Sequence, residues 1–85
     1  MIKPVVAVYD AKLGVYQHPV PAPTKASAIR EFAGACQDSN SKLNKHAEDF
    51  TLFHLADYDD EMGTYKNLTA PVALAQALEF KNAQQ

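Results

Sequence analysis

The strongest strand pattern in the chain is Phe50-Thr51-Leu52-Phe53-His54-Leu55-Ala56-Asp57-Tyr58. Apolar residues occupy both of its alternating sets, a pattern typical of a central strand that is covered on both faces. A domain of 85 residues has room for one such strand with a few elements packed around it. The other elements are therefore expected to assemble on either side of this segment.

A β-hairpin is predicted at the start of the chain. Val5–Asp10 is rich in β-branched residues and too short for a helix, so it is expected to be a strand. Asp10–Gly14 supplies an Asp that starts a turn and a Gly that tolerates positive φ. Val15–His18 is the second strand, and the three prolines that follow within residues 19–23 place its later part at an edge or in irregular extended chain.

One amphipathic helix follows the prolines. Thr24 is a good N-cap residue. After it, apolar residues recur at three- and four-residue steps, namely Ala26, Ile29, Phe32, Ala33 and Cys36. Gly34 costs a helix interior about 1 kcal/mol relative to Ala, and close packing against the sheet is the expected reason for its presence.

The second half of the chain alternates polar connections with short elements. Residues 39–49 are expected to form a polar connection with one helical turn near Ala47–Asp49. Thr64–Leu68 is expected to be a short edge strand. Pro71 suits the first position of a C-terminal helix that runs to about Glu79, or the same segment is an extended arm that covers a partner chain.

Together these elements predict an α+β fold in the order β-β-α-β-β. Its architecture is a four-stranded antiparallel sheet with one amphipathic helix on one face and a short C-terminal helix or tail. Residues 1–80 are expected to form a single domain, and residues 81–85 a frayed tail.

Composition limits the ways in which so small a domain is stabilised. A domain of this size buries only about 60–65% of the surface that its unfolded chain exposes, and Cys36 is the only cysteine, which rules out an internal disulfide. Association with another copy remains, and a homodimer is favoured. The N-terminus lacks the apolar region of a signal peptide and no stretch is long enough to span a membrane, so a cytoplasmic, soluble protein is expected.

Familiar catalytic and metal-binding patterns do not fit the chain. A calcium loop that began at Asp57 would need Gly and Glu where Met62 and Leu68 stand. The three histidines and Cys36 have no zinc-like spacing, and Cys36 is expected to be a small core residue. The three glycines lie too far apart for a phosphate loop. The sequence thus predicts a non-enzymatic protein without metal, cofactor or small-molecule substrate.

The N-terminal hairpin carries the one candidate binding surface. Aromatic rings and cations occur together there with a single acid, Asp10; the candidate nucleic-acid-binding residues are Lys3, Tyr9, Lys12, Tyr16 and His18. Single-strand binders use such a combination of stacking faces and positive charge. The alternative is that one or both tyrosines pack under the helix with only the phenol oxygen at the rim.

Several short motifs, in the same order along most of the chain, resemble one phage family. They are Val8-Tyr9-Asp10-Ala11-Lys12, the prolines leading to Ala28-Ile29-Arg30-Glu31-Phe32, Lys45-His46-Ala47-Glu48-Asp49-Phe50-Thr51-Leu52-Phe53, Asp57-Tyr58-Asp59-Asp60-Glu61-Met62-Gly63-Thr64, and the closing Pro71-Val72 and Ala77-Leu78-Glu79-Phe80. The chain is similar to the small nonstructural DNA-binding protein of gokushoviruses, the single-stranded DNA phages of the family Microviridae. The resemblance implies a protein of the bacterial cytoplasm with a role in the switch to single-strand synthesis and packaging.

Two hypotheses follow from this pattern. In the first, the protein binds single-stranded DNA or the phage and host replication proteins. In the second, it is a protein-interaction module, such as a homo-oligomeric adaptor or assembly factor, that never contacts nucleic acid. The resemblance favours the first hypothesis, which is the one expected here. The net charge of −2, from eight Lys and Arg against ten Asp and Glu, favours the second, because DNA-coating proteins carry an excess of positive charge.

Overall fold

The computed structural model describes residues 1–81, and it has the α+β fold that the sequence predicts. Its elements are β1 (Ile2–Asp10), β2 (Val15–Tyr16), β3 (Val20–Pro21), α1 (Lys25–Gln37), α2 (Lys42–Lys45), η1 (Ala47–Asp49), β4 (Phe50–Asp59), β5 (Thr64–Gln76) and α3 (Leu78–Lys81). Lys81 ends α3, and the rest of the expected tail, residues 82–85, lies outside the described residues.

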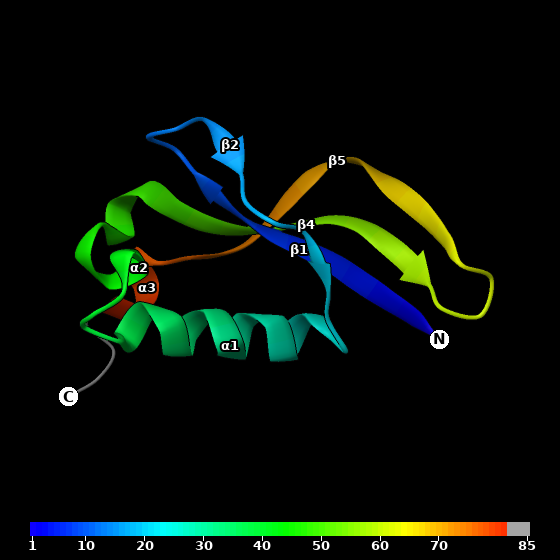
Figure 1. The fold of residues 1–85 in the computed structure, drawn as a ribbon, viewed down its shortest axis with the longest axis horizontal. Helices are drawn as coiled ribbons and strands as arrows, with labels where there is room; N and C mark the ends of the chain where they lie inside the picture. Colours follow the sequence, from blue (N-terminus) through cyan, green and yellow to red (C-terminus); the bar gives the residue numbers. More distant parts are fainter. Residues whose placement is uncertain (82–85) are drawn as a thin grey trace.

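β4 is the central strand of an antiparallel sheet. The strand order is β2-β1-β4-β5, and β3 also pairs with β1. β4 pairs along its whole length with β1 on one side, and on the other side it pairs with β5 from Thr51 to Asp59. α1 packs against one face only, while β2 and β5 rise from the sheet on the other side (Figure 1). The expectation that β4 is covered on both faces is therefore half right.

The helix begins where the sequence predicts. Thr24 and Ser27 form a capping box, in which Ser27 N–H donates to Thr24 Oγ1 at 3.0 Å and Thr24 N–H donates to Ser27 Oγ at 3.1 Å. Phe32 and Cys36 project from α1 into the core, and Phe32 meets Phe80 of α3 edge to face, with ring centroids 6.2 Å apart. At 13 residues α1 is the longest of the described helices, and none of the helices within residues 1–81 has the length and apolar character needed to cross a membrane.

Between α1 and β4 the chain makes two short helical turns. η1 is the turn that the sequence places at Ala47–Asp49, whereas α2 is not predicted. α2 forms because Ser41 caps it, accepting from Asn44 N–H at 3.2 Å. The side-chain amide of Asn44, through Nδ2, donates to Cys36 O at 2.8 Å, and this hydrogen bond holds α2 against the end of α1.

The core between α1 and the sheet is small. Five of its ten buried residues are alanines, and its large members come from α1 and from β4; the ten are Val6, Ala22, Ala28, Phe32, Cys36, Ala47, Phe50, Leu52, Ala75 and Ala77. A core with so few methylene groups gives limited hydrophobic stabilisation, since burial contributes roughly in proportion to apolar area.

The C-terminal segment differs from the prediction. Residues 71–76 belong to the long strand β5, and helix is confined to Leu78–Lys81. The outer edge of β4 requires hydrogen-bonding partners, and the segment from Val72 to Gln76 supplies them opposite His54 to Thr51. Pro71 lies in an irregular stretch, residues 68–71, that faces only Leu55, so its missing N–H interrupts no ladder bond. Residues 71–76 are therefore a strand of this domain's own sheet, and the short C-terminal helix that the sequence predicts is present at Leu78–Lys81.

Gly34 does not have the packing role expected of it. It lies on the exposed side of α1, and a Cβ at this position would have no atom within 4 Å. The glycines that do require special backbone freedom are Gly14 and Gly63, which close the β1–β2 and β4–β5 turns at φ +72 and +69.

We predict that Gly34→Ala stabilises the protein by about 1 kcal/mol, because it removes backbone entropy from the unfolded chain and meets no steric obstacle. Urea unfolding followed by circular dichroism measures the change in the free energy of unfolding. The matched control is Ala33→Gly, the neighbouring position on α1, which should lose a similar amount. A Gly34→Ala protein less stable than the parent would show that the glycine is needed.

Candidate functional site on the open face of the sheet

The strand register divides the side chains of the sheet between two faces. Directly opposed residues of antiparallel strands project to the same face. Val6 and Val8 of β1 contact the core and oppose His54 and Leu52, so these residues face α1. The alternate pairs, beginning with Ala7 opposite Phe53, face away from it. We call this second side the open face.

Three aromatic rings gather on the open face at the β1–β2 end. Tyr9 opposes Tyr16 in the register, and their ring centroids are 4.7 Å apart. Phe53 of β4 meets both rings edge to face, with centroids 6.0 Å from Tyr9 and 5.5 Å from Tyr16. We call Tyr9, Tyr16 and Phe53 the hairpin cluster. Tyr16 is 42% exposed, so the cluster presents a ring to solvent and does not lie under α1.

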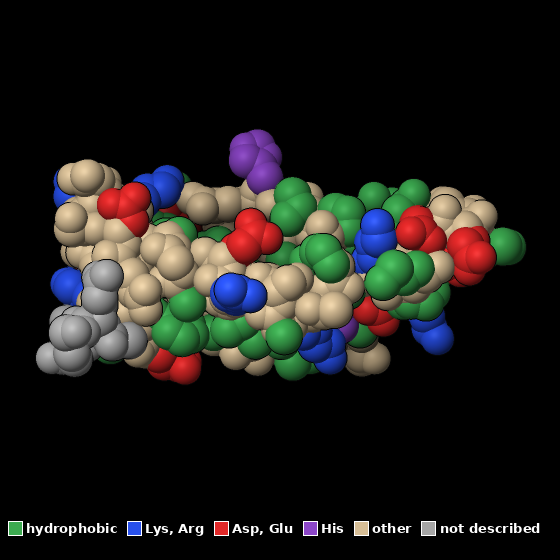
Figure 2. Space-filling view, turned by 90° about the horizontal axis from the view of Figure 1, so that it is seen from below, with side chains coloured by type: hydrophobic (Ala, Val, Ile, Leu, Met, Phe, Trp, Pro, Cys, Tyr) green, Lys and Arg blue, Asp and Glu red, His purple; other side chains and the backbone are tan. Residues whose placement is uncertain are grey.

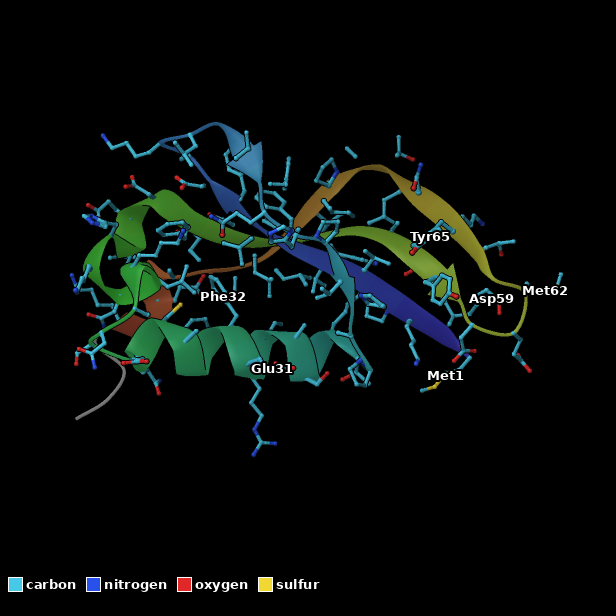
Figure 3. All side chains as sticks on the ribbon, viewed as in Figure 1. Met1, Glu31, Phe32, Asp59, Met62 and Tyr65 are labelled. Carbon is cyan, nitrogen blue, oxygen red and sulfur yellow. The ribbon has the colours of Figure 1, made fainter. Side chains whose placement is uncertain are left out.

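A second pair of rings lies on the same face toward the β4–β5 turn. Tyr58 opposes Tyr65, with ring centroids 4.9 Å apart, and Tyr58 also opposes Lys3 of β1. We call Tyr58 and Tyr65 the distal cluster. Tyr65, labelled in Figure 3, is 65% exposed. All four tyrosines of the chain thus share one face of the sheet.

Sequence reasoning identified Tyr9 and Tyr16 but missed Phe53 and the distal cluster. Phe53 was assigned to a strand covered on both faces. Tyr58 and Tyr65 flank an acidic turn, which was considered only as a calcium loop. The equal spacing of the two tyrosines from the centre of a predicted hairpin turn was the available signal, because it places them opposite each other.

Carboxylates are absent from the open-face positions of the strands in residues 1–81. The strand acids Asp10, Asp57 and Asp59 all project to the helix side. The others lie on α1, in the connections, in the β4–β5 turn or on α3, namely Glu31, Asp38, Glu48, Asp49, Asp60, Glu61 and Glu79. Figure 2 shows the helix side of the molecule, where acidic and basic side chains are mixed and acidic ones gather at the end with the β4–β5 turn. The net negative charge therefore does not describe the open face.

The basic candidates occupy three different places. Lys3 lies on the open face beside Tyr58, with its Nζ 3.5 Å from Asp60 Oδ2. Lys12 is exposed in the β1–β2 turn, where it lines a hollow with Asp10 and Lys42 on the helix side. His18 lines a cavity of about 260 Å³ between β3 and α1. The structure brings Lys3, Tyr9 and Tyr16 onto one surface. His18 lies at its border, because it also lines a hollow with Tyr16, and Lys12 lies toward the helix side.

The acidic β4–β5 turn is partly neutralised by the chain start. The Met1 ammonium donates to Asp60 Oδ1 at 2.8 Å and to Glu61 Oε1 at 3.2 Å. The hydrogen bond from this ammonium, with a smaller contribution from Lys3, holds the pKa of Asp60 below its usual value. The two carboxylates in turn raise the pKa of the Met1 amine.

Two further titratable side chains, His54 and Cys36, are buried. His54 is buried, and its Nε2 lies 2.9 Å from Asp57 Oδ1, which satisfies the imidazole. Cys36 is fully buried in the core, and this burial raises the pKa of its thiol. Within residues 1–81, no group of three or more His, Cys, Asp or Glu side chains is arranged to hold a metal ion.

One family model, that of the phage ORF5 protein, matches residues 3–80. The chain belongs to this family. No curated protein and no solved structure matches it. The matched span of this phage ORF5 protein includes α1, the whole sheet from Lys3 onward and both aromatic clusters.

We predict that Cys36 of the folded protein reacts with a thiol reagent only when the structure opens, because the protonated, buried sulfur is a poor nucleophile. Labelling with an aromatic disulfide, followed by absorbance, should be slow in buffer and fast in urea. It should become slower still in Gly34→Ala, which favours the closed state. Fast labelling in buffer that is independent of stability would contradict the burial.

Proposed function

We propose that this phage ORF5 protein binds single-stranded DNA through the open face of its sheet. In this proposal it is a non-enzymatic, nonstructural protein of the host cytoplasm that acts in single-stranded genome synthesis or packaging. The observation that carries the proposal is the hairpin cluster, a group of aromatic rings with Tyr16 exposed, on the face away from the strand carboxylates. The resemblance to the gokushovirus nonstructural protein supports the same role.

Stacking on the hairpin cluster is the main source of affinity in this proposal. A base that stacks on an aromatic side chain gains roughly 1–3 kcal/mol whatever its sequence, because every base has a π-face. Tyr16 is the most accessible ring of the cluster. It packs against Tyr9 in a tilted arrangement and against Phe53 edge to face, and these contacts fix its position. The bases of a duplex are already stacked on one another, so the single strand is the preferred ligand.

Phosphate contacts have a smaller share. Lys3, beside Tyr58 on the open face, and Lys12, in the β1–β2 turn next to the hairpin, are the two cations that this proposal assigns to phosphates of the bound DNA strand. Proteins that coat DNA by charge use many more. A protein of net charge −2 can therefore bind single-stranded DNA in this way, because stacking supplies most of the affinity.

We predict that Tyr16→Ala weakens binding to a fluorescently labelled oligothymidylate at least about fivefold, the lower end of the stacking range. Fluorescence anisotropy at low salt, near 50 mM, measures the affinity where phosphate contacts are strongest. Val15→Ala is the matched control, because Val15 is the other residue of β2, is similarly exposed at 48% and opposes Asp10 on the helix side. Equal losses in both variants, or no binding by the parent protein, would contradict the proposal.

We predict a shallow salt dependence for the same complex. Two phosphate contacts at about −0.7 each give a slope of about −1.4 in a plot of log K against log salt. Lys12→Gln should reduce this slope by about half, and the same anisotropy titrations over a salt series measure it. A slope several times steeper would show that cations elsewhere, on α1 or α2, form the binding surface.

The second candidate function is association with another protein chain, a second copy of this one in the first instance. The outer edge of β5 favours it, because no described strand pairs there and residues 70–73 are all exposed and apolar. Unpaired edges add strands from partners by backbone hydrogen bonds. Pro71 and the hydrogen bond from Gln76 N–H to Glu79 Oε2, 2.8 Å long, limit the length available.

The oligomeric state tests this second candidate. Light scattering coupled to size exclusion should show a dimer that dissociates on dilution, and Val72→Lys should make it monomeric by placing a charge at the edge. A parent protein that is monomeric at every concentration would remove the second copy as the partner.

A further inference from the structure

The distal cluster, Tyr58 and Tyr65, has no role in binding at the hairpin cluster. Tyr65 exposes about two thirds of its side chain and stacks against Tyr58 only. A large exposed aromatic ring on a sheet that has no helix over it contributes little to the core. The region of the β4–β5 turn also extends past the end of α1, so no part of the core depends on it (Figure 1).

We propose that Tyr58 and Tyr65 form a second base-stacking site for the same single strand of DNA. Lys3, which lies beside Tyr58 on β1, supplies the phosphate contact of this site. This inference rests on the proposed function, since it assigns a second contact to the strand that the hairpin cluster holds. Lys3 opposes Tyr58 in the register, which places an ammonium group beside the ring pair. Lys3 Nζ lies 3.5 Å from Asp60 Oδ2, and Asp60 also accepts from the Met1 ammonium at 2.8 Å, so Asp60 keeps a cationic partner when Lys3 turns to a phosphate.

β4 connects the two sites and fixes their separation. Phe53 belongs to the hairpin cluster and Tyr58 to the distal cluster, so the sites lie five residues apart on one strand. At about 3.3 Å per residue this distance is roughly 16 Å. A single strand that stacks throughout at about 3.4 Å per nucleotide covers it in about five nucleotides, and a more extended strand covers it in fewer.

A strand that reaches both sites binds more tightly than one that reaches a single site. Once the first base is stacked, the second contact is intramolecular, and its effective concentration is high because the connecting strand is short. Affinity should therefore rise steeply with oligonucleotide length up to about six nucleotides and only gradually beyond. Binding at the hairpin cluster alone gives no such step.

The test compares two variants on two ligand lengths. Tyr65→Ala should weaken binding of a ten-nucleotide oligothymidylate at least about fivefold and leave binding of a trinucleotide unchanged. Tyr16→Ala should weaken both. Tyr65→Phe, which keeps the stacking face and removes the hydroxyl, should restore the parent affinity. Thr64→Ala is the matched control, because Thr64 is the adjacent exposed residue of β5 and opposes Asp59 on the helix side.

Intrinsic fluorescence supplies a second readout that needs no label. The chain has no tryptophan, so its emission comes from four tyrosines that all lie on the open face. The ten-nucleotide ligand should quench more of this emission than the trinucleotide, and Tyr65→Phe should reduce the difference to the part that comes from Tyr58.

The outcomes separate this inference from the proposed function. If Tyr16→Ala weakens binding of the longer ligand but Tyr65→Ala does not, the distal cluster is no binding site and the proposed function stands. If the parent protein binds neither ligand, both are overturned. An equal effect of Thr64→Ala and Tyr65→Ala would also overturn the inference, since it would show that the loss comes from the strand and not from the ring.

Discussion

The pairing of β4 with a neighbour on each side is the constraint on which the rest of the structure depends. β1 and β5 satisfy its backbone groups along both edges, and its side chains divide the domain into a core and an open face. Phe50 and Leu52 project toward α1 and close the core, whereas Phe53 projects to the other side and completes the hairpin cluster. An irregularity at Leu55 shifts the register against both neighbours. As a result Asp57 faces the helix side and Tyr58 the open face.

Most of the fold follows from patterns that are local in sequence. The β1–β2 hairpin, the Thr24 cap, the amphipathic spacing of α1 and the β4 segment each have a nearby chemical cause, and each is found where the sequence predicts it. Residues 71–79 are the exception. Val72, Leu74 and Ala75 fit a helical stripe as well as a strand, and the choice is made by the unpaired edge of β4, which lies some twenty residues away in the sequence.

The candidate site is predictable to a similar degree and for the same reason. Tyr9 and Tyr16 are joined by a tight turn, so their proximity can be inferred from the hairpin alone. His18 follows Tyr16 by two residues, but it lies where the chain passes from β2 to β3, and it faces both a hollow beside Tyr16 and the cavity between β3 and α1. The face on which the tyrosines project depends on the position of α1, and this is set by long-range packing. The separation of acids from aromatic rings depends on the register of β4, including the shift at Leu55, which no composition analysis can supply.

The sheet explains how an acidic protein can offer a surface for a polyanion. Its carboxylates lie on the helix side, in the connections and in the turn that the Met1 ammonium partly neutralises, while the open face carries rings and Lys3. The most direct test of this account is a map of aromatic and methyl NMR signals during titration with an oligothymidylate. The account predicts shifts in Tyr9, Tyr16, Tyr58 and Tyr65 and none in Leu43 or Ile29 on the α1 side. Shifts confined to α1 and α2, or none at saturating ligand, would contradict it.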